Sequence, residues 1–269
     1  MIDTVHIEKH NEVYLRIDAE ASIIMEMSQY FEFDVPGAKF SPAYRNKMWD
    51  GKIRLLNNMT RMLYAGLLPY VVSFCEDRSY ECIISEDFKP LAKYDKDCGY
   101  ALADLIKAPY ELRDYQNEAF VECLNSERKL LLSPTGSGKS FIIYLLTRWH
   151  QAQDKRTLII VPTTSLVHQM ASDFVEYNNG EPMDIHKIMA GAEKDIDNKI
   201  VVTTWQSIHR LKKPWFQSYD VVIGDEAHLF KAKSLTNILS KMDDCRYRYR
   251  FTGTLDGTQT HKLVLEGLF

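Results

Sequence analysis

The sequence has no apolar run that approaches the roughly 18 residues of a membrane span. Its first residues lack the basic start and apolar core of a secretory signal. The five cysteines are scattered without a CxxC pair or a zinc-ligand spacing, and the eight histidines form no cluster. A net charge of −4 gives no overall basic character. These absences disfavour a membrane protein, a disulfide-built or zinc-built fold and a uniformly basic nucleic-acid binder. They favour a cytoplasmic protein with reduced thiols.

At 269 residues the chain is long enough for about two domains. Residues 1–88 are predicted to form a small α+β unit, and residues 89–110 a connector with a short helix at 100–106. Within the small unit we expect a strand or hairpin over 5–17, a helix from Asp18 or Ala19, a strand over 51–56, a helix over 66–74 and a strand over 80–84.

Charge is uneven within the small unit. Residues 1–38 hold two basic and eight acidic side chains, whereas residues 39–61 hold six basic and one acidic. The aromatic residues Phe40, Tyr44, Trp49 and Tyr64 lie in and beside this basic run. Basic groups interleaved with aromatics suit nucleic acid, but a solvated basic face above buried aromatics would give the same pattern. The candidate nucleic-acid contacts are Lys39, Arg45, Lys47, Lys52, Arg54 and Arg61.

The strongest local motif is the segment LLLSPTGSGKS, residues 130–140. An apolar run stops at Ser133, a turn containing two glycines follows, and an apolar helical pattern begins at Lys139. Glycines let backbone N–H groups approach phosphates closely, and a helix N-terminus attracts negative charge. We expect Lys139 to reach the β- and γ-phosphates of a nucleotide and Ser140 to ligate Mg²⁺. The expected nucleotide-binding residues are Pro134, Thr135, Gly136, Ser137, Gly138, Lys139 and Ser140.

From residue 111 onward, short apolar runs alternate with amphipathic helical patterns. The runs are residues 129–132, 157–161, 200–202, 221–223 and 247–251, and the helical patterns between them are 115–124, 139–149, 166–177 and 235–242. This alternation predicts an α/β fold with a mainly parallel sheet covered by helices.

Polar segments follow the ends of all five runs: residues 133–140, 162–164, 203–207, 225–228 and 252–254. The carboxyl ends of parallel strands meet at one edge of a sheet, where ligands bind. Asp225 at a strand end can hold Mg²⁺, and the adjoining Glu226 can orient or deprotonate an attacking water. We therefore expect ATP and Mg²⁺ at this edge, with Lys139, Asp225 and Glu226 as catalytic residues and Ser140 and Asp225 as metal ligands.

Residues 111–269 resemble the superfamily 2 helicases and translocases whose motif II carries the letters DEAH. The matching segments are residues 112–116 (LRDYQ, the adenine-reading Q motif), 133–140 (motif I), 162–169 (motif Ia), 203–207 (TTWQS, the next strand-contacting motif), 225–228 (DEAH, motif II) and 252–254 (TGT, motif III). A small residue such as Ser133 in place of the first glycine of motif I is common in this family. The whole chain, residues 49–52 included, resembles the amino-terminal part of the recombination helicases of T-even phages.

The resemblance implies a RecA-like motor domain over residues 111–269 and a role for each matching residue. Arg113 and Gln116 would take part in ATP binding, with Gln116 reading the adenine. The residues that would couple nucleotide state to nucleic acid are His228, Thr252, Gly253 and Thr254. Those that would contact the backbone of one nucleic-acid strand are Pro162, Thr163, Thr203 and Thr204.

Family members bind ATP between two RecA-like domains, and the second domain supplies arginine fingers. This sequence ends at Phe269, soon after motif III, so we expect the second motor domain to be absent from the chain and the chain alone to be weak or inactive. Arg246, Arg248 and Arg250 precede motif III in a strand-like alternation, which makes them poor finger candidates.

The resemblance implies an ATP-dependent DNA helicase or translocase that remodels branched DNA in recombination, repair or replication. A monomer is favoured, and the site of action would be the host cytoplasm if the chain is phage-encoded. One alternative is an RNA helicase or an enzyme that unwinds RNA–DNA hybrids. Another is a nucleotide-gated binding module without hydrolysis, although Glu226 argues against it because binding alone needs no water-activating base.

Overall fold

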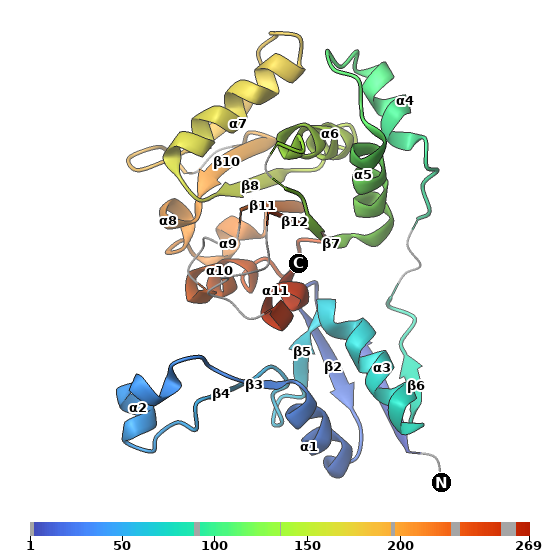
Figure 1. Cartoon of the computed structure of the whole chain (residues 1–269), viewed down its shortest axis with the longest axis vertical. Coiled ribbons are helices and arrows are strands. Elements are labelled where there is room, and N and C mark those ends of the chain that lie inside the picture. Colours follow the sequence, from blue (N-terminus) through green and yellow to red (C-terminus); the bar gives the residue numbers. More distant parts are fainter. Residues whose placement is uncertain (1–2, 89–91, 135, 195–196, 227–231, 254–261) are drawn as a thin grey trace. The chain divides into compact units, whose positions relative to one another are not determined.

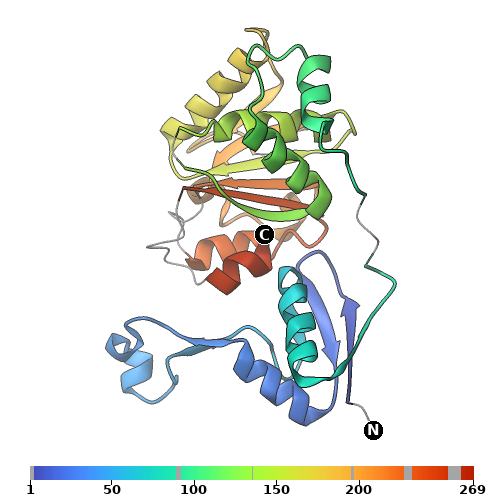
Figure 2. The same cartoon turned by 45° about the vertical axis from the view of Figure 1, so that its right-hand side comes forward.

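The computed structural model describes residues 3–88, 92–134, 136–194, 197–226, 232–253 and 262–269 (Figures 1 and 2). The chain divides into two compact units, Met1–Lys89 and Pro90–Phe269. Among the described residues, no helix is long and apolar enough to cross a membrane.

The first unit is built on a four-stranded sheet with the order β5-β2-β1-β6. Its strands are β1 (Thr4–Lys9), β2 (Tyr14–Asp18), β5 (Met62–Tyr64) and β6 (Glu81–Ile84). Burial alternates along β1 and β2, as expected for a sheet that buries one face. Two helices, α1 (Ala21–Tyr30) and α3 (Leu68–Arg78, preceded by the short helix η2, Ala65–Leu67), contribute buried residues to this core.

An extended arm, residues 32–54, leaves this sheet (Figures 1 and 2). Its stem is the antiparallel pair β3 (Glu32–Asp34) and β4 (Lys52–Arg54), and its tip holds the short helices η1 (Ala38–Phe40) and α2 (Pro42–Arg45). The sequence indicated only the second stem strand, because the other arm elements are three or four residues long and show no clear apolar period.

The second unit contains a six-stranded sheet with the order β7-β12-β11-β8-β10-β9, in which every neighbouring pair is parallel. The strands are β7 (Arg128–Leu132), β8 (Thr157–Val161), β9 (Ile185–Ile188), β10 (Ile200–Thr204), β11 (Val221–Asp225) and β12 (Tyr247–Thr252). The predicted α/β fold class with a parallel sheet is confirmed. The strand β9 was not expected, because only its two end residues are apolar.

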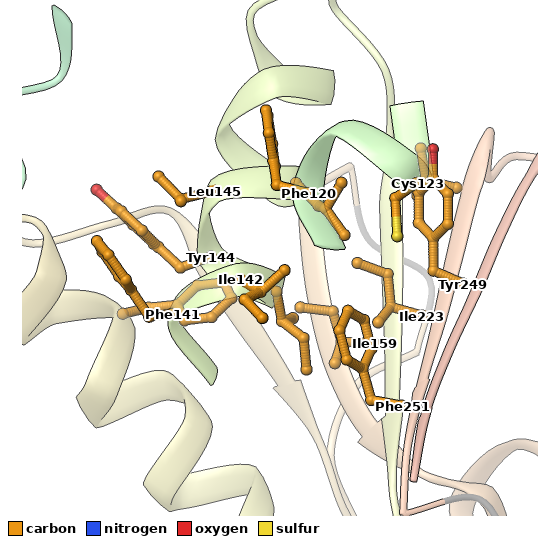
Figure 3. Close-up of a cluster of buried hydrophobic side chains, with 14 of the residues drawn as sticks. Phe120, Cys123, Phe141, Ile142, Tyr144, Leu145, Ile159, Ile223, Tyr249 and Phe251 are labelled. Atoms are coloured by element: carbon orange, nitrogen blue, oxygen red, sulfur yellow. The ribbon is translucent and has the colours of Figure 1, made fainter. Parts of the chain in front are cut away.

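Helices cover both faces of this sheet (Figures 1 and 2). Their bounds are α4 (Cys98–Leu105), α5 (Asp114–Ser126), α6 (Lys139–Gln151), α7 (Thr164–Tyr177), α8 (Trp205–Ile208), α9 (Lys213–Phe216), α10 (Ala232–Leu239) and α11 (Lys262–Leu268). Figure 3 shows part of the main core, which combines helix residues such as Phe120 of α5 and Tyr144 of α6 with sheet residues such as Ile223 and Phe251. The stretch expected to be a connector contains α4, whose Leu102 is part of this core.

Candidate nucleotide site and nucleic-acid surfaces

The segment between β7 and α6 forms a tight loop with two glycines in the left-handed region. Gly136 has φ +82° and Gly138 has φ +75°, and residues other than glycine rarely adopt such backbone angles. Ser133 is buried, and its hydroxyl lies 2.5 Å from the Ser137 hydroxyl, which also donates to the Pro134 carbonyl at 2.7 Å. The Ser133 side chain therefore joins the two ends of the loop by a hydrogen bond to Ser137. Thr135 lies outside the described residues.

Gln116 connects helix α5 to this loop. Its Nε2 donates to the Ser137 carbonyl at 3.0 Å, while its Oε1 accepts from the Arg113 N–H at 3.1 Å. The Tyr115 hydroxyl donates to the same Ser137 carbonyl at 3.0 Å. The two predicted residues Arg113 and Gln116 thus lie beside the loop of residues 133–138, called the phosphate loop below for its expected ligand. Gln116 holds this loop by a hydrogen bond and also lines the neighbouring pocket.

A pocket of about 690 Å³ adjoins the loop and the start of α5. Three aromatic rings in its lining meet edge to face, with centroid distances of 5.9 Å for Tyr110 and Tyr177 and 5.0 Å for Phe141 and Tyr177. Glu176 accepts a hydrogen bond from the Tyr110 hydroxyl. The sequence patterns did not indicate these four residues. Phe141 and Tyr177 lie in helices α6 and α7, where aromatic residues are usually part of a core, and Tyr110 and Glu176 belong to no motif. A pocket that combines aromatic rings with polar groups beside such a loop suits a nucleobase.

Ser140 makes its contacts with helix α7. Its hydroxyl lies 2.8 Å from the Tyr177 hydroxyl, and it also bonds the Asp173 carboxylate. Burial raises the pKa of Asp173, and this hydrogen bond opposes the rise. The structure therefore places the predicted metal ligand Ser140 against α7, so Mg²⁺ ligation would require its side chain to rotate.

Asp225 ends strand β11 in an almost fully buried position. Its Oδ1 has no hydrogen-bond partner within the described part of the chain. Burial raises the pKa of the Asp225 carboxyl to about 6, with Lys139 opposing and Glu226 supporting the rise. The described residues contain no cluster of three or more metal-ligating side chains. This arrangement fits Mg²⁺, which is commonly held by one or two carboxylates together with substrate phosphates.

Glu226 joins the three motifs at this sheet edge. Its Oε1 forms an ion pair with Lys139, and its Oε2 accepts from the Gly253 N–H at 3.3 Å. Glu226 itself has φ +47°, a strained value for a residue with a side chain. Thr252 is fully buried, and its carbonyl accepts the Ser133 N–H at 2.8 Å. Segments far apart in sequence thus meet as predicted, although His228 and Thr254 lie outside the described residues.

The expected strand-contacting residues of this unit differ in exposure. Thr163 is exposed and caps helix α7, because its hydroxyl accepts the Leu166 N–H at 3.3 Å. Thr203 is fully buried and donates to the Ile188 carbonyl at 3.0 Å. Pro162, just after β8, and Thr204, the last residue of β10, are also buried. The side chain of Gln206 donates to the Pro162 carbonyl at 3.4 Å. Of the four, Thr163 is best placed to meet a nucleic-acid backbone.

The six basic candidates of the first unit fall into two sets. Lys52 and Arg54 pair with Glu32, Arg54 also pairs with Asp50, and Arg61 pairs with Asp18. The other three lie at the arm tip without an ion pair to any described residue. They are Lys39, Arg45 and Lys47.

Exposed apolar side chains accompany the unpaired set. Phe40 is 66% exposed, Tyr44 42% and Met48 77%, whereas Tyr64 is partly buried and stacks on Tyr14 with centroids 5.5 Å apart. Burial therefore explains Tyr64, and it does not explain Phe40 or Tyr44. The tip of the arm presents basic and apolar groups together to solvent.

Comparison with known proteins assigns both units. Residues 109–257 match the family model described as "Type III restriction enzyme, res subunit", and residues 4–85 match "DNA helicase UvsW, N-terminal". The chain is 33% identical to the ATP-dependent DNA helicase UvsW of Enterobacteria phage T4, over 98% of the chain and 55% of that protein. A 150-residue stretch, 56% of the chain, is 29% identical to the DNA 3'-5' translocase XPB2 of Sulfurisphaera tokodaii, and it covers 32% of that protein.

Comparison with solved structures gives the same relationship to UvsW. A crystal structure of the UvsW helicase from bacteriophage T4 superposes with a TM-score of 0.88 at 32% identity, covering 99% of this chain and 98% of that one. A second T4 UvsW structure gives a TM-score of 0.90, with 56% of that longer chain covered. The chain thus spans about half the length of the curated UvsW protein. It belongs to the helicase family of the type III restriction enzyme res subunit and closely resembles the amino-terminal part of T4 UvsW.

Proposed function

We propose that the chain carries the nucleotide-binding motor unit and a substrate-recognition unit of an ATP-dependent DNA helicase or translocase that remodels branched or recombination DNA. The observation that carries the proposal is the meeting of Lys139, Glu226 and the Gly253 N–H at one strand edge, beside the buried Asp225. Its relation to a phage DNA helicase supports DNA as the substrate. By the same relation, the site of action would be the cytoplasm of the host.

The geometry suggests how ATP would be held. The adenine would enter the pocket beside Tyr110, Phe141 and Tyr177, at hydrogen-bonding reach of Gln116. The triphosphate would follow the N–H groups of the loop at Gly136 and Gly138, and Lys139 would leave Glu226 for the β- and γ-phosphates.

Two carboxylates would then divide the chemistry. Asp225 would hold Mg²⁺, which would supply charge neutralisation on the phosphates. Glu226, freed from Lys139, would orient and deprotonate the attacking water. The N–H of Gly253, just after the neighbouring strand β12, would hold the other oxygen of Glu226. A change in the protonation or position of this carboxylate would therefore act on the residues that follow β12. The residues 252–254 would in this way couple hydrolysis to nucleic acid.

DNA binding would use both units. In the first, the arm tip offers three basic residues that form no ion pair with a described residue, beside the exposed rings of Phe40 and Tyr44. Such groups bind phosphates and stack on bases without reading sequence. In the second, exposed Thr163 at the start of α7 would contact the backbone of one strand.

The test is ATP hydrolysis by the chain with and without branched DNA. We expect weak hydrolysis that requires Lys139 and Glu226 and rises with DNA, and turnover at full helicase rates would contradict the expected need for a second motor domain. Competition between branched DNA and structured RNA identifies the polymer, and preference for RNA would contradict the DNA assignment. Hydrolysis that is unchanged in Lys139→Met would contradict the site itself.

A further inference from the structure

Arg250 on β12 is fully buried, and its Nε, Nη1 and Nη2 atoms have no hydrogen-bond partner among the residues described. Arg248, two residues earlier on the same strand, is equally buried, but its guanidinium has hydrogen-bond partners. Arg248 donates to the carbonyls of Cys245 at 3.0 Å, Leu239 at 3.3 Å, Leu268 at 3.0 Å and Met242. A buried guanidinium without partners is costly to the fold, so Arg250 calls for an explanation that Arg248 does not.

Strand register and charge place Arg250 near Glu226. Tyr249 and Phe251, its neighbours along β12, both point into the core shown in Figure 3, so alternation places Arg250 on the opposite face of the sheet. Its register partner on β11 is Gly224, which has no side chain to occupy the adjoining space. Two residues after Gly224 comes Glu226, whose N–H donates to the Phe251 carbonyl at 3.0 Å.

The charges agree with this proximity. Burial lowers the pKa of the Arg250 guanidinium to about 10, and the negative charge of Glu226 opposes that fall. Glu226 therefore lies within electrostatic reach of two cations. One of them, Lys139, is its ion-pair partner, and the other is Arg250, whose guanidinium has no hydrogen-bond partner in the described part of the chain.

We propose that Glu226 exchanges Lys139 for Arg250 when a nucleoside triphosphate binds, so that Arg250 is a positioning residue for Glu226. This inference rests on the proposed function. Phosphates draw Lys139 away and leave the Glu226 carboxylate without its cation. Pairing with Arg250 then satisfies a carboxylate and a buried guanidinium at the same time. The carboxylate is then held by Arg250 of β12 and by the N–H of Gly253, which directly follows β12. Binding of the triphosphate thereby changes the contacts of β12 and of the residues after it.

The exchange predicts a thermodynamic coupling between Arg250 and Glu226 in nucleotide binding. The experiment titrates a non-hydrolysable ATP analogue with Mg²⁺ into the wild-type chain, Arg250→Met, Glu226→Gln and the double variant. Without Arg250, Glu226 holds Lys139 more firmly, so Arg250→Met weakens binding about fivefold in the wild-type background. With Glu226→Gln there is no carboxylate to exchange, so adding Arg250→Met changes the affinity by less than about twofold.

A purely structural role for Arg250 gives a different pattern. It predicts that Arg250→Met lowers the melting temperature and weakens binding equally with and without Glu226→Gln. The exchange predicts an unchanged or higher melting temperature, because methionine replaces an unpaired buried charge by an apolar chain of similar size. It also predicts that Arg250→Lys, which keeps the charge, binds within about twofold of wild type. Equal effects in both backgrounds overturn the exchange. A wild-type chain that binds no nucleotide overturns the proposed function and the exchange together.

Discussion

The ammonium group of Lys139, at the start of helix α6, forms an ion pair with Oε1 of Glu226, 87 positions later in the chain. Both side chains are largely shielded, with 13% and 20% of their surface exposed. The pair joins the phosphate loop to the end of strand β11. The two groups proposed for catalysis therefore bind each other in this structure. In the proposed function, a triphosphate would separate them before either group acts.

Replacing Glu226 with glutamine separates binding from chemistry. The amide cannot take a proton from water, so we expect Glu226→Gln to lower ATP hydrolysis by about 100-fold or more while nucleotide binding persists. Hydrolysis and binding are measured on the same preparation. Glu122→Gln is the matched control, because Glu122 pairs with Lys129 on the surface at 2.9 Å. Equal hydrolysis by Glu226→Gln and Glu122→Gln would contradict the role of Glu226.

The two glycines of the phosphate loop differ in what surrounds them. A Cβ on Gly138 would lie 2.3 Å from Nε2 of Gln116, whereas a Cβ on Gly136 would meet nothing within 4 Å. Both alanine variants carry left-handed strain, but Gly138→Ala also displaces the bond from Gln116 to Ser137. We expect Gly138→Ala to be less stable than Gly136→Ala by about 1 kcal/mol. Denaturant unfolding measures the difference, which should vanish in a Gln116→Ala background; if it persists there, Gln116 is not its cause.

The arm tip makes a prediction about salt dependence. Changing Lys39, Arg45 and Lys47 to glutamine should weaken duplex DNA binding and flatten the plot of log affinity against log salt by up to about three units. The control removes the same charge from Lys52, Arg54 and Arg61, which are already paired with Glu32, Asp50 and Asp18. This second set should change the slope less. An equal or larger effect of the control set would reject the tip as the binding surface.

His150 predicts acid sensitivity of the second unit. Burial lowers the pKa of His150 from 6.5 to about 3, and its Nε2 lies 3.1 Å from the Tyr249 hydroxyl. Because the unfolded chain binds the proton more readily, the stability from neutral His150 is present above pH 6.5 and is lost as pH falls toward 3. Between pH 7 and pH 5 the wild type should lose about 2 kcal/mol more than His150→Gln. Parallel losses in denaturant titrations at the two pH values would refute this account.

Arg248 is predicted to be a stabilising residue without a direct part in nucleotide binding. Its guanidinium reaches carbonyls at the ends of α10 and α11 and in the turn before β12. Arg248→Met would leave these buried acceptors unpaired and should cost about 3 kcal/mol of stability. Arg250→Met, which removes a guanidinium that has no hydrogen-bond partner among the described residues, is the matched comparison in thermal unfolding. Equal destabilisation by the two variants would contradict the difference between these neighbouring arginines.

Periodicity alone predicted the second unit well, and the reason is visible in particular elements. Strand β8 is apolar at four of its five positions and buried at all of them, so residues 157–161 were predicted with the observed bounds. Strand β9 was missed because two polar residues separate its apolar ends and its partial burial depends on β10 alongside. The arm was largely missed for a similar reason, since tertiary pairing between β3 and β4 defines it.

The site was predictable as a set of segments but not as a set of contacts. Parallel strands bring residues 133–140, 225–226 and 252–253 to one edge, and this follows from topology. No sequence pattern indicates that Ser140 contacts Tyr177, that Glu226 pairs with Lys139, or that Arg250 has no hydrogen-bond partner among the residues that the structure describes. These contacts depend on side-chain rotamers and on the packing of helix α7 against α6 in the folded unit.

Equilibrium titration of the chain with ATP and Mg²⁺ tests the central claim most directly. The account predicts saturable binding of one ATP per chain, weakened at least tenfold by Lys139→Met, because the ammonium group meets the phosphates. Lys129→Met, which removes a lysine from strand β7 outside the loop, should bind as the wild type does. No binding by the wild-type chain, or equal affinity in Lys139→Met and wild type, would contradict the account.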